Sequence, residues 1–556
     1  MVQHMKWWGW GEEGIAFDHT DKPALGPFVH ERIGLDLDAP PAGVPLVADL
    51  PIPPPMATPE LRAALGRAVG AEHVHDDALD RVTHTYGKSL RDLVRIRRGE
   101  LGRLPDLVVY PGDESQVDDV VRSALAADAV IIPFGGGTNI SGSLEAPRHE
   151  TRTVVSVDLG RMDRLLELDE EAGLARVEAG ALGPRIEAQL GERGWTLGHF
   201  PDSFTHSSLG GWIATRSSGM QSDRYGDIAD ITRAVRVVTP TGTLATRPVP
   251  ATSTGPSVRE MVLGSEGRLG VITEATVVVH RLPAERRILA YMFPDWDAGL
   301  AALREVAVGD AAPSVTRLSD ANETAFSMAT RRAGSFFSAL ASWLLRAYLR
   351  RIKGYDPDRL CLAFVGYEGS APHVRAQRRL VERSTKAHGG VGLGAGPGTL
   401  YDQKKFDTPY IRDFLLDRGG LADVSETAAP WSRLRGVYDG VVEAAEKAFA
   451  TIGVRGWVMC HLSHSYRTGA CLCVTFAFRR AGGHDPVHQY DVVKTAIQQA
   501  FIDHGGTLSH HHAVGREQAR WLADDISPTG LTLLRTLFDG LDPGHNLNPG
   551  QITGDP

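Results

Sequence analysis

Residues 133–139 read Pro-Phe-Gly-Gly-Gly-Thr-Asn and directly follow the apolar run 130–132. Consecutive glycines leave backbone N–H groups free to converge on an anion, because no side chain stands in the way. A pyrophosphate fits such a nest, but three glycines alone are also typical of a tight turn between two elements. The neighbouring segments therefore have to decide between these two interpretations.

Three further loop segments follow this one at a distance. They are Pro201-Asp202-Ser203, then Ser208-Leu209-Gly210-Gly211-Trp212 with Ser217-Ser218-Gly219, and finally 264–273, which reads Gly-Ser-Glu-Gly-Arg-Leu-Gly-Val-Ile-Thr. None matches the spaced dinucleotide fingerprint or the lysine loop of nucleoside-triphosphate sites. Binding of NAD or of ATP alone is therefore disfavoured.

The pattern of residues that predicts secondary structure changes several times along the chain. Residues 1–55 predict an irregular arm, because they end in Pro51-Ile52-Pro53-Pro54-Pro55, and helical spacing dominates 58–101. Short β-branched runs then predict strands at 107–110, 130–132, 154–157 and 235–238, and a helix at 117–126. After Pro283 we expect longer helices mixed with strands such as 360–365 and 471–478, and near the end a helix at 531–538 and turns over 542–550.

Composition narrows the class of protein. Apolar residues make up 42% and charged residues 23% of the 556 residues, which is typical of a globular protein. The net charge of -9, without a dense basic stripe, argues against a nucleic-acid surface. Cys361, Cys460, Cys471 and Cys473 are too few for a disulfide framework, and Met1–Gly14 lacks the pattern of a signal peptide. We expect a cytoplasmic protein.

The ordered glycine loops resemble the vanillyl-alcohol-oxidase-type FAD-binding domain, over almost all of residues 100–280. The resemblance implies an α+β fold with a two-subdomain FAD-binding domain, an α/β substrate (cap) domain and a C-terminal segment that returns to the flavin. No histidine lies in the first glycine loop, so we expect FAD to be held non-covalently. The implied cofactor-binding residues are Pro133, Phe134, Gly135, Gly136, Gly137, Thr138, Asn139, Pro201, Asp202, Ser203, Ser207, Ser208, Gly210, Gly211, Thr215, Ser217, Ser218, Glu266, Gly267, Leu269, Gly270, Val271 and Ile272.

Five strings outside that domain resemble the alkyldihydroxyacetonephosphate synthase family. They are Lys-Trp-Trp-Gly-Trp-Gly at 6–11, Pro-Tyr-Ile-Arg-Asp at 409–413, Glu-Thr-Ala-Ala-Pro-Trp at 426–431, Ser-His-Ser-Tyr-Arg-Thr-Gly-Ala-Cys at 463–471, and Ser-His-His-His-Ala-Val-Gly at 509–515. The resemblance implies an enzyme of ether-lipid synthesis that replaces the acyl group of acyl-dihydroxyacetone phosphate with a long-chain alcohol, through an adduct at flavin N5 and without net redox. We expect an N-terminal arm and helical region at 1–101, the FAD-binding domain at 102–284, the cap domain at 285–505 and the returning segment at 506–556.

His510, His511 and His512 are the first catalytic candidates. Imidazoles titrate near neutral pH and are suited to moving protons. A metal site is the rival interpretation, but adjacent histidines seldom converge on one ion and no acidic or cysteine partner is spaced nearby in the sequence. A solvated polar loop is the other alternative. We therefore predict proton transfer and no metal.

Arg317 and Arg412 occupy the places of two arginines that the family uses for the substrate and its phosphate. The planar guanidinium can grip an anion from two sides. Taken singly, each arginine could instead form an ordinary surface ion pair. The motif context favours substrate binding.

The sequence departs from the family at two places. Where the family has an acid/base tyrosine, this chain has Cys473, which could titrate if its pKa were lowered but could equally be a small buried hydrophobe. Tyr466 is a candidate substitute. The ending Asn548-Pro549-Gly550 is closer to flavin-dependent D-2-hydroxyacid dehydrogenases. An FAD-linked dehydrogenase or oxidase of a hydroxy acid or alcohol is therefore the first alternative, and a non-enzymatic membrane-associated flavoprotein is the second.

An apolar stripe at helical spacing precedes three basic residues. Its members are Phe336, Phe337, Leu340, Trp343, Leu344, Tyr348 and Leu349, followed by Arg350, Arg351 and Lys353. Such a stripe usually packs in a core. The functional interpretation is docking on a membrane surface, which would admit a lipid-like phosphate ester and a long-chain alcohol. We also expect a homodimer.

Overall fold

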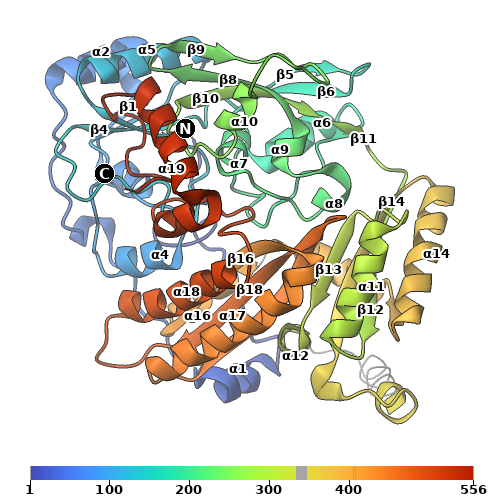
Figure 1. The fold of residues 1–556 in the computed structure, drawn as a ribbon. Coiled ribbons are helices and arrows are strands. Elements are labelled where there is room, and N and C mark those ends of the chain that lie inside the picture. Colours follow the sequence, from blue (N-terminus) through green and yellow to red (C-terminus); the bar gives the residue numbers. More distant parts are fainter. Residues whose placement is uncertain (1, 333–346, 405, 407, 555–556) are drawn as a thin grey trace.

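The computed structural model describes residues 2–332, 347–404, 406 and 408–554. The part drawn in blue to green, at the top of Figure 1, begins with a four-stranded sheet whose central strands are parallel. Its order is β1 (Val74–His75), β2 (Leu107–Val109), β4 (Val154–Asp158) and β3 (Val130–Phe134). Helices α2 (Pro59–Val69) and α5 (Glu114–Ala126) pack together beside it. The strands are Val- and Ile-rich because both faces of a parallel sheet are covered.

A five-stranded antiparallel sheet shares a hydrophobic core with the first one. Its order is β5 (Leu165–Asp169), β6 (Leu174–Glu178), β10 (Val271–Val278), β8 (Thr232–Thr239) and β9 (Gly242–Ala245). The short pair β7 (Trp195–Thr196) and β11 (His280–Arg281) lies at its end. The helices of this region are α6 (Gly183–Gly191), α7 (Leu209–Thr215), α8 (Ser222–Tyr225), α9 (Ile228–Ile231) and α10 (Val258–Val262). These two sheets form the half that the sequence predicts to bind FAD, which we call the FAD-binding half.

The lower part of Figure 1 is a seven-stranded antiparallel sheet, which we call the cap sheet. Its order is β15 (Val391–Gly394), β12 (Glu285–Phe293), β14 (Cys361–Gly369), β13 (Val315–Ser319), β17 (Gly456–Ser465), β18 (Gly469–Arg479) and β16 (Gly420–Pro430). One face is covered by α11 (Trp296–Val308), α14 (Ala371–Ala387), α17 (Trp431–Thr451) and α18 (Pro486–Asp503). The other face carries α12 (Ala321–Ala329) against the central strands, and α15 (Gly396–Lys404) and α16 (Thr408–Leu416) near the two edges, and it borders the cavity described below.

Both ends of the chain connect the two halves. The N-terminal arm is less irregular than predicted, because Leu25, Val29 and Ile33 form a buried stripe on α1 (Leu25–Ile33), which contacts α12, β17 and β18. Helices α3 (Ala78–Thr83) and α4 (Leu90–Arg97) follow. The C-terminal α19 (Leu522–Leu541) returns to the FAD-binding half, where Leu547 bridges Ile131 beside β3.

Most predicted elements are confirmed. The strands expected at 107–110, 130–132, 154–157, 235–238, 360–365 and 471–478 lie in β2, β3, β4, β8, β14 and β18, and the two predicted helices lie in α5 and α19. The apolar stripe at 336–349 falls mainly outside the described residues. Of its described members, Leu349 is buried in a cluster with Leu360 and Leu362. In the described ranges, no helix combines the length and the apolar character needed to cross a bilayer.

Candidate active site

A cavity of about 1360 Å³ lies between the FAD-binding half and the face of the cap sheet that carries α12, α15 and α16. The glycine loop at 133–139 forms part of its wall, and alternate residues of β13, β17 and β18 form the facing wall. All of the predicted cofactor-binding residues line it except Leu269 and Val271, which point into the core. The cavity therefore gathers loops that are up to 139 residues apart in sequence, from Pro133 to Ile272.

The glycine loop has the geometry of an anion nest. A Cβ on Gly136 would collide with the carbonyl oxygen of His206, and Gly137 has a φ of 67° that favours glycine. Within the described residues, the N–H groups of Gly135, Gly136 and Gly137 find no protein acceptor. The buried Oδ1 of Asn548, which also lines the cavity, has no partner there either. Free amides and a free acceptor around one cavity fit the pyrophosphate and ring edges of FAD.

Arg317 belongs to a compact group that we call the arginine cluster. Its Nη2 donates to Oε1 of Glu323 at 2.7 Å, and Nδ1 of His461 lies 3.1 Å from Nη2 and 3.0 Å from Glu323 Oε2. The guanidinium also lies 5.7 Å from the centre of the Tyr401 ring. Burial alone would raise the pKa of Glu323, but His461 and Arg317 outweigh it and lower that pKa to about 2. Glu323 is thus ionised and fixes the guanidinium at the cavity wall.

Arg412 enters the cavity from α16. The next residue, Asp413, accepts a hydrogen bond from the backbone N–H of Trp10 at 2.5 Å, and a Cβ on Gly11 would collide with Tyr410. The tryptophan motif of the arm therefore positions the helix that carries Arg412. Both arginines predicted to bind substrate line the same cavity.

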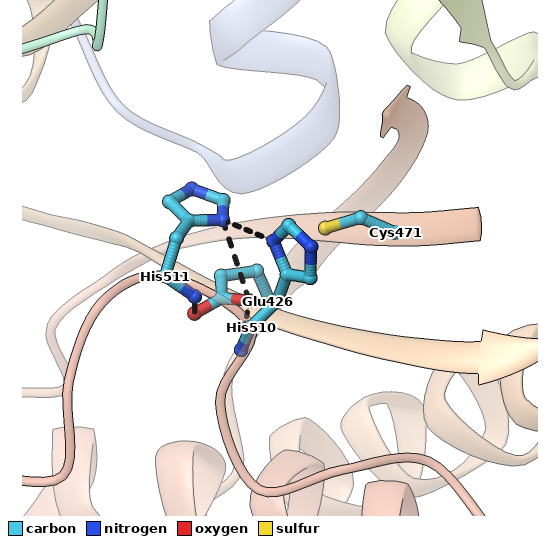
Figure 2. Close-up of side chains that lie close together, drawn as sticks. All are labelled: Glu426, Cys471, His510 and His511. Atoms are coloured by element: carbon cyan, nitrogen blue, oxygen red, sulfur yellow. Dashed lines mark hydrogen bonds and ion pairs between the residues drawn. The ribbon is translucent and has the colours of Figure 1, made fainter. Parts of the chain in front are cut away.

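The three histidines are held by one buried carboxylate. The backbone N–H of His510 donates to Glu426 at 2.6 Å, and those of His511 and His512 donate at 3.0 Å and 2.9 Å. Ser509 Oγ adds a fourth bond at 2.8 Å. Burial opposes ionisation of Glu426, but the neighbouring histidines and the backbone donors outweigh it and hold its pKa below its ordinary value. Figure 2 shows the carboxylate beneath the two imidazoles.

A second glutamate holds the continuation of this segment from the other half. Glu266, predicted as a cofactor-binding residue, accepts the backbone N–H groups of Val514 at 2.9 Å and Gly515 at 3.0 Å, as well as Ser143 Oγ. The histidine segment is thus fixed to β16 of the cap sheet at one end and to the FAD-binding half at the other. Its side chains sit where the two halves meet.

The histidine side chains do not all have the same place. His511 and His512 line the cavity. His510 and Tyr466 are not among the residues that line it. Tyr466 Oη lies 2.7 Å from Asp227 Oδ2 and 2.6 Å from His510 Nε2, and His510 Nδ1 lies 2.9 Å from His511 Nδ1. We call Asp227, Tyr466, Glu426 and the three histidines the histidine cluster. Tyr466 thus acts on the cavity only through His510.

Cys473 lies between the two clusters. On neighbouring strands it is paired directly with His461 of β17 and with Glu426 of β16. Its side chain lines the cavity, but burial raises the pKa of the thiol above its ordinary value. A reactive thiolate requires a lowered pKa, and the pKa of Cys473 is not lowered.

The sequence argument against a metal did not foresee which side chains the fold brings to the histidines. One ligand atom each from Glu426, Cys471, His510 and His511 lies within 4.8 Å of the others (Figure 2). The oxygens of Glu426 are already engaged by backbone donors, and burial raises the pKa of Cys471, whereas metals bind the thiolate. The group fits an internal anchor better than a metal site, and no metal remains our prediction.

Several members of these clusters were not singled out from the sequence. Glu323, His461 and Asp227 carry no motif of their own, and they reach the site through strand pairing and helix capping. Glu426 was part of a quoted string, but its contact with the histidine backbone could not be inferred from residues 84 positions apart. Alternation along β17 and β18 was the one signal that could have placed His461 and Cys473 on a common face.

Known families and proteins match almost the whole chain. Residues 105–246 match the family described as "FAD binding domain", and residues 282–552 match "FAD linked oxidases, C-terminal domain". The chain is 35% identical to alkyldihydroxyacetonephosphate synthase of Dictyostelium discoideum, over 99% of this chain and 94% of the relative. It is 34% identical to the protein of the same name from Trypanosoma brucei brucei, over 100% of this chain and 93% of the relative.

A solved structure agrees with the sequence relatives. A structure of an alkyldihydroxyacetonephosphate synthase superimposes with a TM-score of 0.85 at 34% identity, and the match covers 98% of both chains. The similarity extends over both halves and the two ends of the chain.

Proposed function

The chain belongs to the alkyldihydroxyacetonephosphate synthase family of FAD-binding proteins, and from that premise we propose that it replaces the acyl group of acyl-dihydroxyacetone phosphate with a long-chain alcohol. The fold is the vanillyl-alcohol-oxidase type, and the cofactor is FAD. When bound, FAD would supply the N5 chemistry that the family resemblance implies, without net transfer of electrons. The protein's own residues bind, orient and move protons around it.

The observation that carries this proposal is the shape of the cavity. Besides the two arginines, its lining includes apolar side chains of the N-terminal arm, α16 and the cap sheet, namely Phe17, Phe28, Ile33, Leu415 and Trp457. We call these five residues the apolar channel. A cavity with an anion nest, two arginines and an apolar extension suits a phosphate ester that carries or receives a long alkyl chain.

Each cluster then has a separate task. Arg317 and Arg412 would bind the phosphate-bearing head of the substrate, because guanidinium groups form paired hydrogen bonds to phosphate. His511 and His512 line the same cavity and would handle protons. His510, Tyr466 and Cys473 would support the cavity wall without exchanging a proton with the substrate directly.

The direct test is formation of the ether product. The purified holoenzyme would be mixed with acyl-dihydroxyacetone phosphate and a labelled long-chain alcohol, and the label followed into alkyl-dihydroxyacetone phosphate. We expect one fatty acid to be released for each labelled product. Release of fatty acid without incorporation of the alcohol would contradict the proposal.

The rival function is a flavin-linked dehydrogenase or oxidase, which the ending Asn548-Pro549-Gly550 favours. A panel of D-2-hydroxy acids and alcohols, tested anaerobically, separates the two. A dehydrogenase substrate would bleach the flavin absorbance, whereas we expect the spectrum to remain oxidised.

We further propose that the protein works at a membrane surface in the cytoplasm and forms a homodimer. A lipid substrate that enters the apolar channel supports surface association. Co-sedimentation with anionic vesicles tests the first statement, and light scattering of the eluted holoenzyme tests the second. Unbound protein, or a mass of one chain, would contradict them.

A further inference from the structure

A line of hydrogen-bonding groups runs from the FAD-binding half to the cavity. It begins at Asp227, the N-cap of α9, and passes through Tyr466 and His510 to His511, with successive separations of 2.7, 2.6 and 2.9 Å. Only His511 of these four lines the cavity. Each group has a limited number of protons, so the hydrogen bonds along the line share one direction of donation.

The direction is set at the buried end. Burial alone would raise the pKa of Asp227, but His464 and His510 outweigh it and lower that pKa to about 2, so the carboxylate only accepts. Burial, reinforced by Asp227, raises the pKa of Tyr466, so the phenol keeps its one proton and donates it to Asp227. The oxygen of Tyr466 must then accept the Nε2–H of His510.

The remaining two steps follow if His510 carries one proton, which the oxygen of Tyr466 holds on Nε2. His510, with its proton on Nε2, has a lone pair on Nδ1, and this lone pair accepts the Nδ1–H of His511. His511 then has no proton on Nε2. Burial lowers the pKa of His511 to about 3, so the ring is neutral at physiological pH and Nε2 keeps its lone pair.

We propose that Asp227 and Tyr466 are positioning residues that fix the tautomer of His511, so that its unprotonated Nε2 faces the cavity and takes the proton of the substrate alcohol. This inference rests on the proposed function. The O–H bond of the alcohol breaks, its electron pair stays on oxygen for attack on the substrate carbon, and an N–H bond forms at Nε2. The fatty acid leaves as a carboxylate, and the imidazolium later releases its proton to solvent.

Glu426 offsets part of the cost of the charge that this step creates. Glu426 Oε2 lies 3.6 Å from Nδ1 of His511, and its side chain is 1% exposed. An imidazolium at His511 would therefore face an ionised carboxylate while still donating from Nδ1 to His510. His512 lies at a similar distance from Glu426, but among the described residues no such line of groups sets its tautomer.

Tyr466→Phe is the sharpest variant, because it removes only the hydroxyl that sets the direction. We expect kcat to fall by roughly 10- to 100-fold, the range of general acid–base contributions lost when a group is misoriented, with KM little changed. Asp227→Asn should act on the same line, so the double variant should lose no more than the worse single variant. Tyr110→Phe is the matched control. Tyr110 donates a hydrogen bond to Asp80 over 3.1 Å, and its side chain does not line the cavity.

The decisive readout does not depend on turnover. The ¹⁵N chemical shifts of histidine in the holoenzyme, with the His511 signals assigned by loss in His511→Gln, report which ring nitrogen carries the proton. We expect Nδ1 protonated and Nε2 unprotonated in the wild type and in Tyr110→Phe, and a mixture in Tyr466→Phe. A proton on Nε2 of wild-type His511 would overturn the inference even if Tyr466→Phe failed to fold, as would an unchanged tautomer and kcat in Tyr466→Phe. If the tautomer is as expected but no ether product forms, the proposed function fails instead.

Discussion

The arginine cluster and the histidine cluster line one cavity on either side of Cys473, but they balance charge in different ways. In the arginine cluster, ionised Glu323 contacts Arg317 directly, so charge is balanced by charge at 2.7 Å. In the histidine cluster, the carboxylates contact backbone N–H groups and a phenol, and the His511 imidazole that Glu426 holds in place remains neutral. The first arrangement fixes a permanent cation, and the second keeps proton acceptors available.

This difference explains why both clusters are needed for the proposed exchange. A substrate with a phosphate requires a charge that does not change during the reaction, whereas deprotonation of an alcohol requires a group that gains a charge and loses it again. Cys473 lies between them, paired with His461 on one strand and Glu426 on the other. The contrast predicts that damage to the histidine cluster lowers kcat, and that damage to the arginine cluster raises KM.

The largest effect is expected for Glu426→Gln. The amide would present its own N–H donors to the backbone N–H groups of residues 510–512, and each unsatisfied donor costs about 1–3 kcal/mol. A displaced catalytic group commonly costs about 100-fold in rate. We expect kcat to fall by at least about 100-fold, with FAD retained, as measured by steady-state assay and the flavin spectrum.

Glu368→Gln is the control for this prediction. Glu368 is equally buried at 1% exposure and accepts from Tyr225, but it lies outside the cavity. We expect lower stability and an unchanged kcat. If both variants lost only stability, Glu426 would have no role in orienting the histidines.

Arg317→Lys should give the next largest effect, and on the other kinetic constant. Lysine keeps the charge but loses the planar fork, which costs about 1–1.5 kcal/mol at a phosphate site. We expect KM for the phosphate substrate to rise about 10-fold with kcat changed less. A fall in kcat at unchanged KM would place Arg317 in proton transfer and remove the distinction between the clusters.

The clusters also differ in how far they could be predicted. The glycine loops could be predicted from the sequence because backbone conformation is encoded locally. Of the 23 predicted cofactor residues, 21 line the cavity. His461, Glu323 and Asp227 were not readable, because strand register and helix packing bring them in from separate elements. Single-residue roles within 510–512 required the location of Glu426, which no local pattern contains.

A smaller effect is a difference between the two clusters in how their contribution to folding stability depends on pH. The folded-state pKa of His511 is lowered from 6.5 to about 3, so the unfolded chain binds the extra proton, and stability falls as pH drops below about 6.5. The pKa of Glu323 is lowered from 4.5 to about 2, so its contribution is present above pH 4.5 and is lost as pH falls toward 2.

Denaturant unfolding at several pH values measures both contributions. One unmatched proton changes the free energy of unfolding by about 1.4 kcal/mol per pH unit. We expect His511→Gln to flatten the curve between about pH 6.5 and 3, and Glu323→Gln to flatten it only below about pH 4.5. Identical windows for the two variants would contradict the assignment of opposite charge states.

The smallest effect is expected for Cys473→Ala. Burial raises the pKa of the thiol, so it is protonated at neutral pH and supplies no base. We expect kcat to change by less than about threefold and alkylation by iodoacetamide at pH 7.5 to be slow. A 100-fold loss of kcat on this substitution would instead make Cys473 a catalytic residue.

The central claim is that this FAD enzyme exchanges two groups on a phosphate ester without consuming electrons. An anaerobic reaction of the holoenzyme with acyl-dihydroxyacetone phosphate and a long-chain alcohol, followed by flavin absorbance and by product mass, tests this directly. We expect many ether products per flavin, with the flavin fully oxidised at the end and no electron acceptor added. Product limited to one per flavin, with the absorbance bleached until an acceptor is supplied, would contradict the account.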